Sequence, residues 1–275
     1  MDENHAVVPT DKTNSDVVLR TKDYIEHVVK HLKEDAVLTT RDKLKEAKER
    51  AKLKLKNFRN LFSESEYNYI KSTINKCSVP TVHLLIKDHK DKDKINHHYP
   101  SRLVTPAKNF TSAFPHVGQR GLKQILDRNK IPYSKKNIIQ ASDLKDQLEL
   151  MAIRKSQHRI TSIDAEKMYP SIKFIQIQKA VNYFLRDASE EDKEIARRCL
   201  EMIKFGMDNT FVTFKDRYWI YGGNLPVEEK GLTIGGYESA FLADLVAAWI
   251  LEETFRTFLS TPHSTKFIAT TASIF

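Results

Sequence analysis

Apolar residues recur three and four positions apart in the first third of the chain, the spacing of one face of an α-helix. The stretches that carry this pattern, or that are dense in strong helix formers, are residues 16–35, 41–62 and 63–77. The third opens with Ser63 and, three residues later, Glu66, a pair that forms a capping box at a helix start. We therefore expect helices throughout residues 1–77. Their charge runs are typical of a solvated face, and a surface that follows a nucleic-acid backbone is the alternative.

The pattern changes to short β-branched runs after residue 77. Residues 79–90 and 100–107 indicate two strands, and the hydrophilic segment between them indicates a loop, which together predict a basic hairpin. Apolar and polar positions alternate again over residues 210–223, with aromatic side chains on both arms of a second hairpin. The tip of this second hairpin is expected at Lys215, Asp216 and Arg217.

Helical periodicity returns between and after the hairpins, over residues 117–129, 142–155, 175–187, 190–206 and 237–259. The last of these stretches is apolar on most faces, which predicts a buried helix. Strands and helices are mixed without the strict alternation of a parallel sheet, so the expected fold class is α+β. The sequence contains no glycine-rich phosphate loop of the Walker or dinucleotide type.

The charge balance favours a polyanionic partner. The 275 residues include 45 Lys and Arg against 36 Asp and Glu, a formal net charge of +9, and 40% are hydrophobic, enough for a real core. Nucleic acid is the polyanion expected for such a chain, and a basic but otherwise ordinary surface is the alternative. The two cysteines, Cys77 and Cys199, are too few for a disulfide framework and lack metal-ligand spacing, which fits a reducing compartment.

Neither export nor membrane insertion is expected. The N-terminus, MDENHAVVPT, is polar and acidic instead of basic then apolar, so it does not resemble a signal peptide. The longest apolar stretch, residues 240–251, is interrupted by Asp244 and is shorter than a membrane span. We expect an intracellular protein, nuclear or cytoplasmic, with no membrane partner.

One acid stands where a metal ligand is expected. Residues 160–163 form a predicted strand that delivers Asp164 to its carboxyl end, before a turn and a helix. A carboxylate there can hold Mg²⁺, a hard cation that takes oxygen ligands together with substrate phosphates. A helix N-cap is the alternative role for an aspartate after a strand. Four histidines match no zinc spacing and are expected on loops and the surface, namely His83, His89, His97 and His98.

The stretch IDAEKMYPSI, residues 163–172, resembles the first catalytic motif of reverse transcriptases. The resemblance implies that Asp164 is catalytic and binds both metal ions, that Ala165 contacts the substrate, and that Tyr169 lies under the sugar of the incoming nucleotide. A core tyrosine at the start of a helix is the alternative role for Tyr169.

Residues 208–248 resemble the hairpin and the second palm motif of the same family, a glycine turn followed by a serine and a long apolar helix. The resemblance implies that Gly231, Gly235 and Ser239 contact substrate, and glycine suits this role because it lets a backbone approach nucleotide and template closely. The sequence departs from the family at three positions. Thr233 stands where proline is common, Ile234 where glutamine or methionine is common, and Ala240 where proline follows the serine.

Residues 83–90 and 101–110 resemble the fingers hairpin of this family, whose lysine and arginine meet the triphosphate. By this resemblance Lys87 or Lys90, together with Arg102, binds the nucleotide. Cations on a hairpin suit phosphoryl transfer, which depends on positioning and charge stabilisation. A basic exposed hairpin without such a role is the alternative. The fingers motif KDHK is similar to that of Penelope-like and related retroelements.

Together the motifs imply an incomplete right-hand polymerase of α+β class. Its expected parts are an N-terminal helical region, a fingers-like region and a partial palm, at residues 1–77, 78–157 and 158–275. The resemblance also implies an RNA template, a DNA primer and deoxynucleoside triphosphates as partners, with Mg²⁺ as cofactor.

The acidic partner of Asp164 is missing from the sequence. Two-metal nucleotidyl transfer needs at least two neighbouring carboxylates, and in the family the others come from a Tyr-x-Asp-Asp hairpin. No Asp-Asp pair occurs in the sequence, and Asp244 is expected to be buried or paired. We expect a fragment of a reverse transcriptase that is inactive as this chain, or a non-catalytic nucleic-acid-binding protein derived from one. An unrelated basic α+β scaffold is the third hypothesis.

The tail permits one explanation for the missing motif. One permitted choice of codons for residues 267–273, read from its third base, encodes Tyr-Arg-Asp-Asp-Gly-Ile, the form of that hairpin. We therefore expect a frameshift, an unrecognised intron or a decayed element there, and a poorly ordered or accidentally packed tail over residues 263–275.

Overall fold

The computed structural model describes residues 4–87, 99–131, 133, 137–138, 167–259 and 271–272. Within this part of the chain the helices are α1 (Thr21–Asp35), α2 (Arg41–Asn57), η1 (Arg59–Leu61), α3 (Glu64–Lys76), α4 (Ala113–Arg128), α6 (Met168–Ser171), α7 (Phe174–Phe184), α8 (Glu190–Asp208), η2 (Val227–Glu229) and α9 (Ser239–Leu259). The strands are β1 (His5–Pro9), β2 (Asp16–Arg20), β3 (Ala36–Thr39), β4 (His83–Ile86), β5 (Ser101–Val104), β6 (Asn137–Ile138), β7 (Phe211–Phe214), β8 (Arg217–Tyr221) and β9 (Thr271–Ala272).

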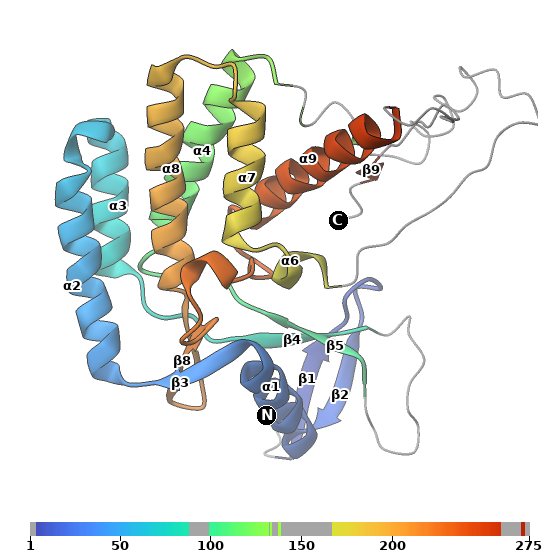
Figure 1. The fold of residues 1–275 in the computed structure, drawn as a ribbon. Coiled ribbons are helices and arrows are strands. Elements are labelled where there is room, and N and C mark those ends of the chain that lie inside the picture. Colours follow the sequence, from blue (N-terminus) through green and yellow to red (C-terminus); the bar gives the residue numbers. More distant parts are fainter. Residues whose placement is uncertain are drawn as a thin grey trace, which may run out of the picture.

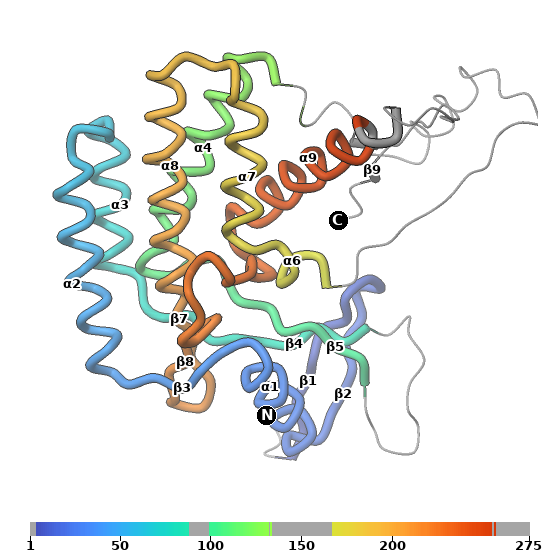
Figure 2. Tube along the Cα trace, viewed as in Figure 1, coloured from blue at the N-terminus to red at the C-terminus, as the bar shows by residue number. Residues whose placement is uncertain are grey.

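These elements separate into a group of helices and a group of strands. Helices α2, α3, α4, α7 and α8 stand together, and α9 crosses beside α7, while α1 and the strands β1 to β5 lie below them (Figure 1). The same path of the chain can be followed in Figure 2. Mixed helices and small, mostly antiparallel sheets confirm the α+β class.

The helical prediction for residues 16–20 is wrong. These residues form β2, which pairs antiparallel with β1 so that Val17 lies opposite Val8 and Val18 opposite Val7. Valine is restricted at χ1 and favours a strand, and β1 supplies the hydrogen-bond partners that make a strand possible here. Helix α1 begins only at Thr21, and β3 interrupts the helical region again before α2.

The start of α3 is confirmed in detail. The Ser63 hydroxyl accepts the backbone N–H of Glu66 at 3.3 Å, and the Glu66 carboxylate accepts the backbone N–H of Ser63 at 3.0 Å. This reciprocal pair satisfies two backbone donors that a helix start leaves without a partner.

Both predicted hairpins are confirmed. In the first, β4 pairs antiparallel with β5, and Leu85 lies opposite Arg102. In the second, β7 pairs with β8 through a two-residue turn at Lys215 and Asp216, both with positive φ, as tight hairpin turns require. Arg217 is the first residue of β8, so the tip is one residue shorter than the sequence predicts.

A three-stranded sheet, in the order β3-β8-β7, lies between two hydrophobic cores. Phe211 and Ile220 lie opposite each other and face a core formed mainly by the helices. The next pair, Val212 and Trp219, faces a second core formed by β1 to β5 and α1. Because side chains alternate across a strand, one short sheet serves both cores.

The helical core buries α9 as predicted. Leu242 and Leu245 are fully buried, and α9 packs against α7, while α4 packs along α8. No helix in the described ranges is both long and apolar enough to cross a membrane.

Several predictions fall outside the described residues. They concern the helix at 142–155, the strand at 160–163, residues Lys90, Asp164 and Ala165, and nearly all of the tail at 263–275. These stay predictions.

Candidate functional site

The end of the first hairpin is bonded to the glycine turn. The backbone N–H of Thr105, the residue after β5, donates to the carbonyl oxygen of Ile234 at 2.9 Å. Gly235 has a φ of +104°, and a Cβ there would lie 2.3 Å from the carbonyl oxygen of Thr105. Only glycine fits both the backbone conformation and the close approach.

The segment that resembles the first catalytic motif is bonded to the same turn. The backbone N–H of Leu232 donates to the carbonyl oxygen of Tyr169 at 3.1 Å, and Gly231 pairs with Lys173 in an isolated β-bridge. A Cβ on Gly231 would lie 2.2 Å from the carbonyl oxygen of Pro170. Three segments far apart in the sequence therefore share one junction, which consists of the end of β5, helix α6 and the turn from Gly231 to Gly235.

Charged groups gather near the Tyr169 phenol. Its pKa is raised by burial first and by the negative charge of Asp244 second, while the positive charge of Arg102 lowers it. The pKa of Tyr133 is raised to about 12, by burial first, by Asp127 second and by the charge of Asp244 third. Asp244 is half-buried in α9 and has an interaction of its own. The expectation that it is buried, capped or paired stays a prediction. Arg102 and Asp244 both lie within electrostatic reach of the Tyr169 phenol.

Arg102 is held by an internal ion pair. Its guanidinium donates to one carboxylate oxygen of Asp11 at 3.2 Å and lies 3.0 Å from the other. The Asp11 side chain is only 8% exposed, and its backbone N–H donates to Ile86, which fixes it beside the hairpin. The segment after β1 thus positions the arginine that the sequence predicts to bind a nucleotide.

Lys87 lies on the same face of this hairpin as Arg102. Leu84 and Leu103 are buried opposite each other, so Leu85, Arg102 and the next alternate position, Lys87, share the other face. Lys87 is half-buried, and its backbone N–H donates to Pro100 at 2.8 Å.

The start of α9 closes the glycine turn. The Ser239 hydroxyl donates to the carbonyl oxygen of Thr233 at 2.8 Å, and the Ser239 side chain is buried. The predicted serine therefore stabilises the turn. Beside it, Lys230 is buried and forms an ion pair of 2.8 Å with Asp208, which anchors the beginning of the turn to the end of α8.

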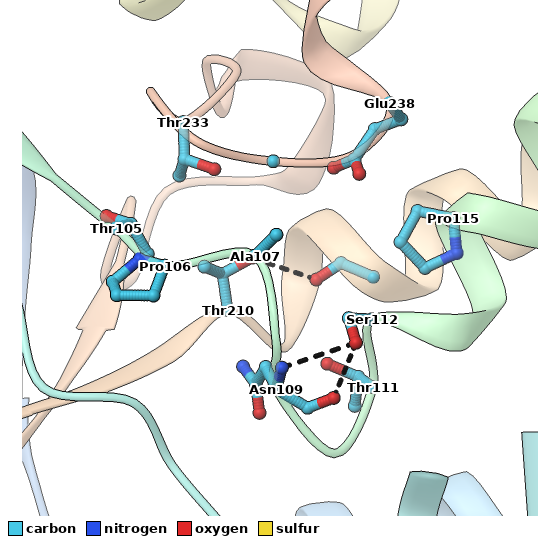
Figure 3. A pocket seen from close by; sticks show the side chains of 12 residues that line it. Thr105, Pro106, Ala107, Asn109, Thr111, Ser112, Pro115, Thr210, Thr233 and Glu238 are labelled. Atoms are coloured by element: carbon cyan, nitrogen blue, oxygen red, sulfur yellow. Dashed lines mark hydrogen bonds between the residues drawn. The ribbon is translucent and has the colours of Figure 1, made fainter. Parts of the chain in front are cut away.

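A small polar pocket adjoins the junction. Its acidic residue, Glu238, is not among the site residues predicted from the sequence. Glu238 is only 8% exposed, and burial raises the pKa of its carboxyl group. Thr233 and Glu238 lie on one side of the pocket, opposite Asn109 and Ser112 (Figure 3). An acid before a helical serine resembles an ordinary capping residue, so only burial distinguishes Glu238. We call this the Glu238 pocket; its polar lining residues include Thr105, Asn109, Ser112, Thr210, Thr233 and Glu238, and Pro115 and Gly236 also line it.

The described residues do not themselves form a metal centre. Within the described ranges no group of three or more His, Cys, Asp or Glu side chains is placed to hold a metal ion. The expectation of Mg²⁺ therefore rests on Asp164, which lies outside those ranges.

Comparison with known proteins finds a likeness at the level of solved structures. No protein-family model matches the chain, and no curated protein matches it. Among solved structures, it is similar to telomerase from Candida albicans, solved in complex with a TWJ fragment of telomeric RNA, with a TM-score of 0.52, 9% sequence identity and 93% of this chain covered. The chain spans 42% of that telomerase chain. At this identity the likeness bears on the fold alone.

Proposed function

We propose that this chain is part of a reverse-transcriptase-like polymerase that binds nucleic acid and nucleotide at the junction of β5, α6 and the glycine turn. The observation that carries the proposal is the meeting of the predicted segments. The hydrogen bonds from Thr105 to Ile234 and from Leu232 to Tyr169 join three stretches that the sequence assigns to one active centre. The likeness to a telomerase supports the same assignment at the level of the fold.

The charges at the junction suit a triphosphate. Lys87 and Arg102 share one face of the hairpin, and Arg102 lies within electrostatic reach of Tyr169. Cations placed there would stabilise the charge of the leaving pyrophosphate, and phosphoryl transfer depends mainly on positioning and charge stabilisation. Gly231, Gly235 and the buried Ser239 would keep the turn close enough for a nucleotide and template to pack against its backbone.

Asp164 and Ala165 would complete the site in an intact polymerase. Asp164 would hold Mg²⁺, which supplies charge stabilisation at the reacting phosphate. A retroelement origin, an RNA template with a DNA primer, and deoxynucleoside triphosphates as substrates belong to this proposal. A non-catalytic nucleic-acid-binding protein of the same fold is the second candidate, because no Asp-Asp pair is present in the sequence.

Primer extension separates the two candidates. The chain is incubated with an RNA template, a DNA primer, deoxynucleoside triphosphates and Mg²⁺, in parallel with an Asp164→Asn variant. Incorporation that the variant loses would support a polymerase active as this chain. Salt-sensitive binding of the template and primer without incorporation would support the inactive or non-catalytic form, and binding of neither strand would refute the proposal.

A further inference from the structure

Three aromatic rings from distant segments meet on the surface beside the junction. His116 of α4 lies between Tyr69 of α3 and Tyr237, with ring centroids 6.1 Å and 5.1 Å away and interplanar angles of 64° and 62°. The two tyrosines are 43% and 45% exposed. Rings that served only to fill the core would be buried, so nearly half of each tyrosine remains free to contact another molecule.

The surface next to these rings is basic. Arg120 follows His116 by one helical turn, and its charge acts on both Tyr69 and His116. Lys123 lies one turn further along the same face of α4, and both cations are exposed. Neither forms an ion pair with a described residue, so their charges are not neutralised within the described part of the chain.

Burial, followed by the charge of Arg120, lowers the pKa of His116. The ring is therefore an uncharged imidazole at neutral pH, and a flat neutral ring can pack against a base as the tyrosines can.

The position of Tyr237 connects these rings to the proposed site. Tyr237 lies between Gly236 and Glu238, both of which line the Glu238 pocket, and His116 follows Pro115, which lines the same pocket. The three rings therefore lie next to the glycine turn, where a nucleic-acid strand bound at that turn could contact them.

We propose that Tyr69, His116 and Tyr237 form a stacking platform for the bases of single-stranded nucleic acid, with Arg120 and Lys123 contacting its phosphates. The inference rests on the proposed function and names the contact through which the junction holds its template. Aromatic faces accept every base, and nearby cations follow the backbone, so such a platform binds single strands with little sequence preference. A duplex hides its base faces and would not use it.

Oligonucleotides with and without bases test this platform. Binding of a thymidine oligonucleotide of roughly 12 nucleotides is compared with that of an abasic strand of the same length, which keeps the phosphates. The unaltered chain should bind the strand with bases more tightly. Each stacked base contributes roughly five- to a hundredfold in affinity, so the double variant Tyr69→Ala, Tyr237→Ala should bind that strand at least roughly fivefold more weakly. Its binding of the abasic strand should not change.

Two controls separate stacking from folding. The variant Tyr69→Phe, Tyr237→Phe keeps both rings and should bind like the unaltered chain. Tyr183→Ala removes a partly exposed ring of α7 that packs against Arg186, outside the platform, and should have no effect. If the double alanine variant prefers bases as strongly as the unaltered chain, the platform is wrong while the proposed function stands. If the unaltered chain binds neither strand, both fail.

Discussion

Gly235 is the residue on which the contact between hairpin and turn depends. Its positive φ and the nearby Thr105 carbonyl oxygen leave no room for a side chain. We expect Gly235→Ala to lower the free energy of unfolding by about 1–3 kcal/mol, the usual range for a strained backbone position, as measured by urea denaturation. Gly236→Ala is the matched control, because Gly236 has no positive φ and its Cβ would meet side-chain oxygens and no backbone carbonyl, so the change should cost less. An equal or larger loss in the control would contradict this account.

Glu238 gives a pH dependence whose sign follows from its burial. Its folded-state pKa is raised above the ordinary 4.5, so the protonated form favours the folded state. The stability that protonation contributes is complete below pH 4.5 and is lost as the pH rises through the folded-state pKa. Glu238→Gln should therefore raise the Tm at neutral pH, by about 2–4 °C for each kcal/mol of burial cost removed. Thermal melts of both proteins should converge below pH 4.5, and a constant difference at all pH values would refute this.

At the scale of single elements, the capping box of α3 holds the helix that carries Tyr69. Ser63→Ala removes the hydroxyl that accepts the Glu66 N–H and should lower the free energy of unfolding by about 1 kcal/mol. Ser72→Ala is the matched control, because Ser72 lies further along the same helix, away from the cap. Equal losses in chemical denaturation would mean that the cap contributes nothing specific.

The elements also show how far sequence reasoning reaches. Both hairpins and the start of α3 could be predicted because alternation, turn residues and capping pairs are local signals. The strand β2 could not, because its apolar residues also continue the helical spacing of the residues that follow, and pairing with β1 decides for the strand. Within the candidate site, the glycines could be predicted because they belong to a sequence motif. The burial of Glu238 and the ion pair between Asp11 and Arg102 could not, because both depend on tertiary structure.

At the scale of the whole molecule, the net charge of +9 should make nucleic-acid binding strongly dependent on salt. Arg102→Ala and Lys87→Ala should each make the slope of log affinity against log salt shallower by about 0.7, the value for one phosphate of a single strand. Binding titrations at several salt concentrations measure this slope. Lys130→Ala is the matched control and should leave the slope unchanged. Lys130 follows the C-terminal end of α4, whereas His116 lies near the start of that helix. Unaltered slopes in the first two variants would remove those residues from the site.

The sheet formed by β3, β8 and β7 has a consequence for how the protein opens. Phe211 and Val212 are neighbours in the sequence but belong to different cores, so neither core can come apart without disturbing the same strand. Local fluctuations should therefore expose the backbone of β7 only when both cores are lost together. In native-state hydrogen exchange, the amides that β7 and β8 share should be among the slowest, and their exchange should report global unfolding of the described helices and strands as one cooperative unit.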